Sequence, residues 1–141
     1  IAGAFLVAPI RKHSQRAIRA RTSSPKLIVR NNALVTALRG VPFEETMRDR
    51  DFYGRLVENA VGAALLDAGE SVFYWSERDK EVDFVVQRGE ELLALEVTAG
   101  EGHAAPGLKT FQNRYPQAKP VRIGGARADY SIERFFQSGL S

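Results

Sequence analysis

A tight hairpin in the middle of the chain limits most strongly how this sequence can fold. Two strand-like runs, 81–87 and 91–98, are separated by a turn that contains Gly89 and Glu90. A two-residue type II′ turn needs glycine at its first central position, because that residue takes a positive φ. The sequence therefore predicts an antiparallel hairpin that pairs the residues on either side of this turn.

The register of this hairpin brings two acidic side chains together. If Arg88 pairs with Glu91, then Asp83 lies directly opposite Glu96. The same register pairs Val85 with Ala94 and Glu81 with Thr98, and it gives the other side of the hairpin one apolar core face: Val82, Phe84, Val86, Leu93, Leu95 and Val97. Like charges that face each other across two strands are destabilising unless a cation lies between them or water reaches them.

A strong helical pattern over residues 49–68 supplies a third carboxylate. Its apolar residues recur at spacings of three and four, and Gly69 ends it. Gly54 and Gly62 lie four residues before and after Glu58, although a glycine inside a helix costs about 1 kcal/mol relative to alanine. We therefore expect the helix to approach the sheet closely and to bring Glu58 towards Asp83 and Glu96.

The remaining elements predict an α/β fold of the α+β type, with a mixed sheet and helices on both of its faces. From residue 49 onward the expected order is helix, strand, strand, strand, helix, strand, with a short final helix. The other expected strands cover residues 1–10, 26–30, 71–75 and 119–123. The other expected helices cover residues 33–39, 104–115 and 131–137, and residues 40–42 read as a loop.

Charge divides the chain into two parts. Of the 141 residues, 1–43 carry eight basic and no acidic side chains, whereas 44–141 have a net charge of −5. We therefore expect a basic leader at 1–43, containing a linker, and a folded domain at 44–141. The leader could contact the phosphates of a nucleic acid through its basic side chains, or serve as a soluble linker, or pair with the acidic part. The candidate phosphate contacts are Arg11, Lys12, Arg16, Arg19, Arg21 and Lys26.

The chain contains no cysteine, which excludes disulfides and thiolate sites and is compatible with a reducing compartment. We expect a cytoplasmic protein. The apolar run at 1–10 is too short to cross a bilayer. The chain begins with Ile rather than Met, and its first residues read as the middle of a strand, so we expect a piece of a longer protein. His13 and His103 are isolated in the sequence, and we expect both at the surface.

The acidic residues lie in short motifs that resemble a known family. Glu58 on a helix, then Glu81-Val82-Asp83-Phe84-Val85, then Leu95-Glu96-Val97-Thr98, followed by an amphipathic helix, resembles the PD-(D/E)XK restriction-endonuclease-like core. More narrowly, residues 20–125 resemble the uncharacterised nuclease-like domain at the C-terminus of many prokaryotic AAA-type P-loop ATPases. The additional motifs that carry this resemblance are Ser24-Pro25-Lys26-Leu27, Glu58-Asn59 and Gly107-Leu108-Lys109-Thr110-Phe111.

The resemblance implies a function as well as a fold. It implies that Glu58, Asp83 and Glu96 bind Mg²⁺ or Mn²⁺, which would polarise a phosphodiester and lower the pKa of a bound water. It also implies that 44–141 is the nuclease-like domain and that 1–43 includes the remnant of a winged-helix region. Any ATP would bind in an upstream ATPase part of the same chain, which is then a natural partner for this domain.

One departure from the family pattern bears on catalysis. Active relatives end the third strand of the core with Glu-x-Lys, whereas this chain has Thr98 in the lysine position, and a hydroxyl cannot supply the positive charge. Lys80 or Lys109 could substitute from a neighbouring element. Asn31 and Asn32 also stand where the ATPase-linked group has an acidic residue and a glycine.

We therefore expect a catalytically degenerate, nuclease-fold accessory domain from the C-terminal part of an AAA-type ATPase, which binds nucleic acid, with DNA as the candidate, or its own ATPase part. Thr98 is included in the degenerate site. The alternatives are an active Mg²⁺- or Mn²⁺-dependent DNA endonuclease and a structural oligomerisation domain.

Overall fold

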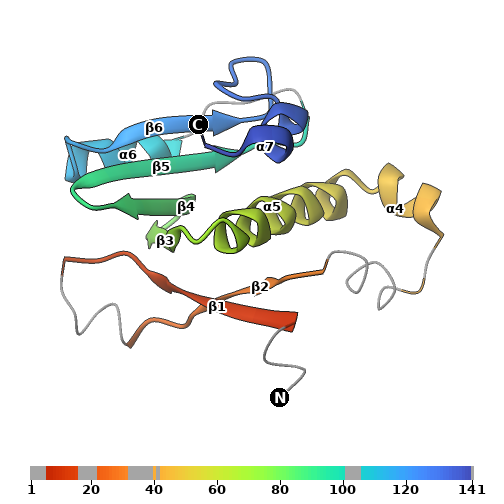
Figure 1. The fold of residues 1–141 in the computed structure, drawn as a ribbon, viewed down its shortest axis with the longest axis horizontal. Helices are drawn as coiled ribbons and strands as arrows, with labels where there is room; N and C mark the ends of the chain where they lie inside the picture. Colours follow the sequence, from red (N-terminus) through yellow and green to blue (C-terminus); the bar gives the residue numbers. More distant parts are fainter. Residues whose placement is uncertain (1–5, 16–21, 32–39, 41, 101–105, 141) are drawn as a thin grey trace.

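The structure is a computed structural model that describes residues 6–15, 22–31, 40, 42–100 and 106–140. These residues form a six-stranded mixed sheet with the strand order β2-β1-β3-β4-β5-β6 (Figure 1). The strands are β1 (Val7–Lys12), β2 (Lys26–Val29), β3 (Ser71–Glu77), β4 (Lys80–Arg88), β5 (Glu91–Val97) and β6 (Lys119–Ile123). The helices are α4 (Phe43–Arg48), α5 (Arg50–Asp67), α6 (Pro106–Arg114) and α7 (Ile132–Ser138).

The sheet combines antiparallel and parallel neighbours, as the order of elements predicts. β1 pairs antiparallel with β2 and parallel with β3, and the meander β3-β4-β5 is antiparallel throughout. β6 then pairs parallel with β5 after the crossover through α6. The mixed α/β fold expected from the sequence is confirmed, and the expected strands at 26–30, 71–75 and 119–123 are found with small differences at their ends.

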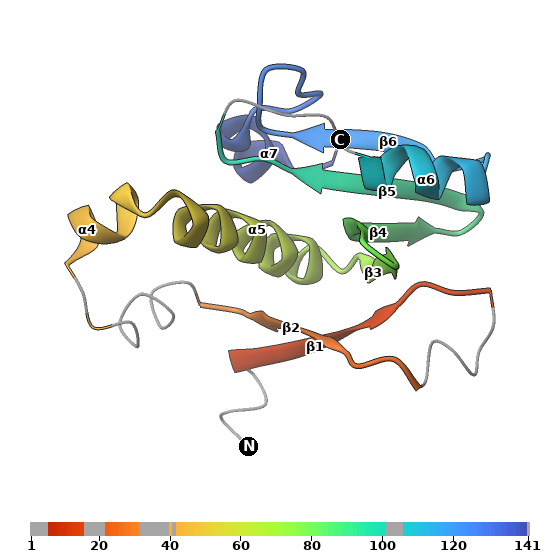
Figure 2. The same cartoon turned by 180° about the vertical axis from the view of Figure 1, so that it is seen from behind.

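Helices cover both faces of the sheet. α5 and α7 lie on the face seen in Figure 1, and α6 covers the opposite face, seen from behind in Figure 2. Val61 of α5 and Phe135 of α7 pack in one core cluster with Phe84 and Leu95 of the sheet. Phe111 of α6 belongs to a second cluster, with Trp75, Val82, Val85 and Ala94. Burial of these two apolar faces holds the layers together.

The central hairpin has the predicted turn and register. Arg88 pairs with Glu91, Val85 pairs with Ala94, and Gly89 has a φ of 59°. The ladder ends at the pair of Phe84 and Leu95, so the predicted pairs at Asp83 and at Glu81 lie beyond the regular ladder.

A β-bulge explains why the ladder ends there. Phe73 pairs with Val85 and Trp75 pairs with Val82, so two residues, Asp83 and Phe84, lie opposite the single residue Tyr74. The bulge shifts the alternation of side chains along β4. Val82 therefore packs with α6, whereas Phe84 packs with α5. The prediction that Val82 shares a core face with Phe84 was wrong.

The sheet extends across the expected division at residues 43 and 44. Arg11 and Lys12 pair with residues of β3, and Ile10 and Ile28 are 2% and 1% exposed within the core that α5 covers. Burial of these two apolar side chains makes β1 and β2 part of the same sheet as the later strands. The expected helix at 33–39 lies outside the described residues, and α4 is a helix that the sequence did not predict.

None of the helices in the described part of the chain is both long enough and apolar enough to span a membrane.

Candidate functional site

The four residues predicted for the catalytic site line one cavity of about 1070 Å³, which we call the carboxylate cavity. Glu58 comes from α5, Asp83 from β4, Glu96 from β5, and Thr98 from the segment that follows β5. The close approach that the glycines of α5 predict is found at Gly62, where a Cβ would lie 2.8 Å from two ring carbons of Phe84. The helix therefore packs directly on the bulged strand and places Glu58 beside it.

Asp83 lies at the bulge, and its Oδ2 accepts a hydrogen bond from the backbone N–H of Val97 at 2.9 Å. Burial, together with the negative charges of Glu58 and Glu96, raises the pKa of Asp83 to about 8, against the opposing effects of the Val97 N–H and the ammonium of Lys26. The surroundings of this carboxyl therefore favour its protonated form.

Glu96 is the second carboxyl with a raised pKa. Burial, together with the negative charges of Glu58 and Glu81, raises the pKa of Glu96 to about 7, against the opposing effects of Lys26 and Arg122. Its Oε2 is buried and has no hydrogen-bond partner among the described residues. We call Glu58, Asp83 and Glu96 the carboxylate cluster. A buried acceptor without a donor is costly, and the Oε2 of Glu96 is such an acceptor in this cluster.

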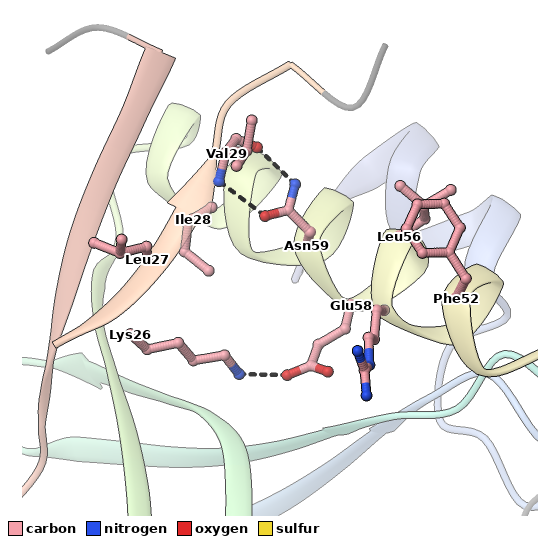
Figure 3. A pocket seen from close by; sticks show the side chains of 9 residues that line it. Lys26, Leu27, Ile28, Val29, Phe52, Leu56, Glu58 and Asn59 are labelled. Carbon is pink, nitrogen blue, oxygen red and sulfur yellow. Dashed lines mark hydrogen bonds and ion pairs between the residues drawn. The ribbon is translucent and has the colours of Figure 1, made fainter. Parts of the chain in front are cut away.

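A lysine from β2 lies inside the cluster. The Nζ of Lys26 donates to Oε1 of Glu58 in an ion pair (Figure 3). The same Nζ lies 3.3 Å from the carbonyl oxygen of Asp83. It also stands 4.6 Å from the centre of the Phe84 ring. The sequence predicted Lys26 as a phosphate contact in a basic leader, whereas the structure places its ammonium against the carboxylates.

Hydrogen bonds between β2 and its neighbours fix the position of Lys26. The amide of Asn59 accepts from the backbone N–H of Val29 at 2.8 Å and donates to the carbonyl of Val29 at 2.6 Å, which closes the outer edge of β2 against α5 (Figure 3). The hydroxyl of Tyr74 donates to the carbonyl of Ser24, two residues before Lys26. The motifs Ser24-Pro25-Lys26-Leu27 and Glu58-Asn59 are far apart in the sequence but lie side by side at this site.

The other predicted residues lie apart from the cavity or outside the described chain. Arg11 is exposed and Lys12 half-buried on β1, and Arg16, Arg19 and Arg21 lie outside the described residues. The two proposed lysine substitutes do not line the cavity either. Lys80 pairs with Asp79 at 3.5 Å, and Lys109 is exposed on α6.

Only two of the three expected ligands are arranged in a way that suits a divalent cation. Among the described residues, no group of three acidic, histidine or cysteine side chains is arranged to hold a metal ion. Asp83 and Glu96 could still hold a cation, since both pKa values are raised and the Oε2 of Glu96 has no donor. Glu58, the third expected ligand, is paired with Lys26.

A family model described as Domain of unknown function (DUF4143) matches residues 53–138, which is more than half of the chain. The chain belongs to the DUF4143 family. No curated protein and no solved structure matches it. The matched part of the DUF4143 domain contains Glu58, Asp83, Glu96 and Thr98, whereas Lys26 precedes it.

A half-buried histidine precedes the matched part of the chain and lies among aromatic side chains. The ring of His13 makes edge contacts with Phe73, Phe111 and Tyr115 at centroid distances of 5.8, 5.9 and 5.0 Å. Burial lowers the pKa of His13, and its Nδ1 has no partner among the described residues. The expectation that His13 lies at the surface was wrong, because the pairing of β1 with β3 carries it between the sheet and α6. His103 lies outside the described residues.

Proposed function

We propose that this DUF4143 domain is a nuclease-fold accessory domain of an AAA-type ATPase, that it binds nucleic acid, and that its carboxylate site is catalytically degenerate. The order α5, β3, β4, β5, α6, β6 agrees with the restriction-endonuclease-like arrangement that the motifs suggest. Three acidic residues and a threonine gather at one end of this core. The ATPase context rests on the resemblance of the motifs alone.

The ion pair between Lys26 and Glu58 is the observation that carries the degenerate assignment. A metal-dependent nuclease needs free carboxylates for the cation and a cationic group beside the attacking water. Here the ammonium is engaged with Glu58 and with the carbonyl of Asp83, and a neutral hydroxyl stands at Thr98. The ammonium of Lys26 thus neutralises the carboxylate of Glu58.

Two arginines of α5 support the binding of nucleic acid. Arg50 and Arg55 line the same cavity as the acidic residues, and neither takes part in an ion pair within the described chain. Both are exposed. Such arginines can neutralise phosphates and release counterions, which gives affinity that falls with salt. They bring positive charge to an otherwise acidic part of the chain.

Plasmid cleavage tests this proposal. The protein is incubated with supercoiled plasmid and Mg²⁺ or Mn²⁺, beside the variants Asp83→Asn and Thr98→Lys. We expect no cleavage by the unmodified protein, retained DNA binding at low salt, and cleavage gained by Thr98→Lys. If none of the three proteins binds DNA at low salt, the nucleic-acid assignment fails and a structural role gains support.

An active metal-dependent endonuclease is the second candidate, and the electrostatics of Asp83 and Glu96 favour it. Both residues are half-buried and have raised pKa values, and the buried Oε2 of Glu96 has no partner among the described residues. A divalent cation bound between them would stabilise their ionised forms. Cleavage by the unmodified protein that disappears in Asp83→Asn would establish this function and refute the degenerate one.

A further inference from the structure

A second hollow lies directly beside the carboxylate cavity. It has a volume of about 310 Å³ and runs between β2 and the first half of α5 (Figure 3). Its walls are mainly apolar, with Ile28 on the strand side and Phe52 and Leu56 on the helix side. We call this hollow the β2–α5 groove. Its volume is at the lower end of the range for small-molecule sites, which suits a group of the size of one nucleotide.

Two residues belong to both hollows. Arg55 and Glu58 line the β2–α5 groove and also line the carboxylate cavity. Glu58 is paired with Lys26, whereas Arg55 forms no ion pair among the described residues. Arg55 is therefore the available positive charge at the point where an apolar groove meets the acidic site.

Two of the polar side chains along the groove are already engaged. The amide of Asn59 is bonded to both backbone groups of Val29, and the ammonium of Lys26 is bonded to Glu58. What the groove offers a ligand is therefore apolar contact and the half-buried ring of Phe52, with one guanidinium at the border. This combination suits a flat aromatic group that carries a nearby negative charge.

We propose that the β2–α5 groove receives the base of one unpaired nucleotide, while Arg55 binds the phosphate of that nucleotide at the border of the carboxylate cavity. This inference rests on the nucleic-acid binding proposed above and specifies the form of the ligand. The base of a duplex is stacked and cannot enter such a groove, so the ligand is a single strand or an unpaired segment.

Fluorescence anisotropy at low salt tests the proposal with two short labelled single strands of equal length. One carries ordinary bases and the other is abasic throughout, so the two differ in the bases and share the phosphates. We expect the strand with bases to bind about tenfold more tightly, the effect of stacking one base on an aromatic ring. We also expect it to bind more tightly than a blunt duplex of the same length.

Two variants assign this difference to the groove. Phe52→Leu keeps an apolar side chain but removes the ring, so the preference for bases should fall to less than about threefold while binding of the abasic strand stays unchanged. Phe136→Leu, at an exposed phenylalanine of α7, is the matched control and should keep the full preference. Arg55→Gln should weaken binding of both strands, whereas the control Arg127→Gln, at another exposed arginine, should not.

The outcomes separate the groove from the wider proposal. Equal affinity for the abasic and normal strands would refute the groove and leave nucleic-acid binding intact. Absence of binding to every nucleic acid would refute both. Displacement of the strand by an equal concentration of a nucleoside monophosphate would show a free nucleotide to be the ligand and would overturn the assignment to a strand.

Discussion

The ammonium of Lys26 on β2 forms an ion pair with the carboxylate of Glu58 on α5, 32 residues later in the chain. The same ammonium contacts the carbonyl of Asp83. A strand at the edge of the sheet therefore supplies the positive charge that is paired with a carboxylate of this site. Because Lys26 lies before the part of the chain that the family model matches, the site depends on residues on both sides of that boundary.

Replacing Lys26 should lower the stability of the protein by leaving the carboxylates without their paired positive charge. Lys26 lowers the pKa values of both Asp83 and Glu96, so Lys26→Met should raise them further. We expect the thermal midpoint to fall at pH 8, where the acids tend to ionise, and to fall less at pH 5, where they stay protonated. Lys109→Met, at an exposed position of α6, is the matched control. An equal loss at both pH values would show that Lys26 acts through packing alone.

Asp83→Asn should stabilise the protein in a pH-dependent way. The pKa of Asp83 in the folded state is raised to about 8, so its contribution to stability is fully present below its unfolded value of 3.8 and is lost as the pH rises through about 8. The asparagine oxygen can still accept from Val97 and carries no charge. We expect a higher thermal midpoint than the unmodified protein at pH 8 and little difference at pH 4.

Asp79→Asn, in the exposed turn between β3 and β4, controls for removal of a carboxylate. It should show no such dependence on pH. A loss of stability in Asp83→Asn at pH 8 would contradict the raised pKa.

The two glycines that flank Glu58 should respond in opposite ways to alanine. At Gly62 a Cβ would lie 2.8 Å from the ring of Phe84, which is fully buried, so Gly62→Ala should destabilise by about 1–3 kcal/mol. At Gly54 a Cβ would meet nothing within 4 Å, so Gly54→Ala should stabilise by about 0.5–1 kcal/mol through helix propensity. Urea unfolding measures both values, and equal effects would contradict the close packing at Gly62.

His13 should make the protein sensitive to mild acid. Burial lowers the pKa of His13 from its ordinary value of 6.5, so the folded state favours the neutral ring. Its contribution to stability is present above pH 6.5 and is lost as the pH falls from there through the lowered pKa of the folded state. His13→Phe keeps an aromatic ring among Phe73, Phe111 and Tyr115 but cannot take up a proton. When the pH is lowered from 7.5 to 5.5, the unfolding free energy of the unmodified protein should fall relative to that of His13→Phe. A difference that does not change with pH would contradict this account.

Local patterns in the sequence predicted the elements of the sheet and the gathering of the acids. The turn at Gly89 fixed the register, and the periodicity around Glu58 identified α5, because both signals arise from nearby residues. The bulge at Asp83 was not predictable in this way, since it results from how β4 pairs with β3. It changes the face of Val82 and ends the ladder before Asp83.

The role of Lys26 was also hidden from the sequence. Its charge reads as part of a basic leader, and only the pairing of β1 with both β2 and β3 brings it to Glu58. The one signal that could have found it is the Ser-Pro-Lys-Leu motif itself, which contributes to the family resemblance but has no evident role in a linker. His13 was misplaced for the same reason, because long-range pairing of β1 decides its surroundings.

Calorimetric titration of the protein with Mn²⁺ at pH 8 tests most directly whether Lys26, rather than a metal ion, neutralises this carboxylate cluster. If Lys26 serves this role, the unmodified protein binds Mn²⁺ no more tightly than Asp83→Asn does. Tight binding of one Mn²⁺ ion by the unmodified protein, lost in Asp83→Asn, would contradict the account and establish a metal site at Asp83 and Glu96.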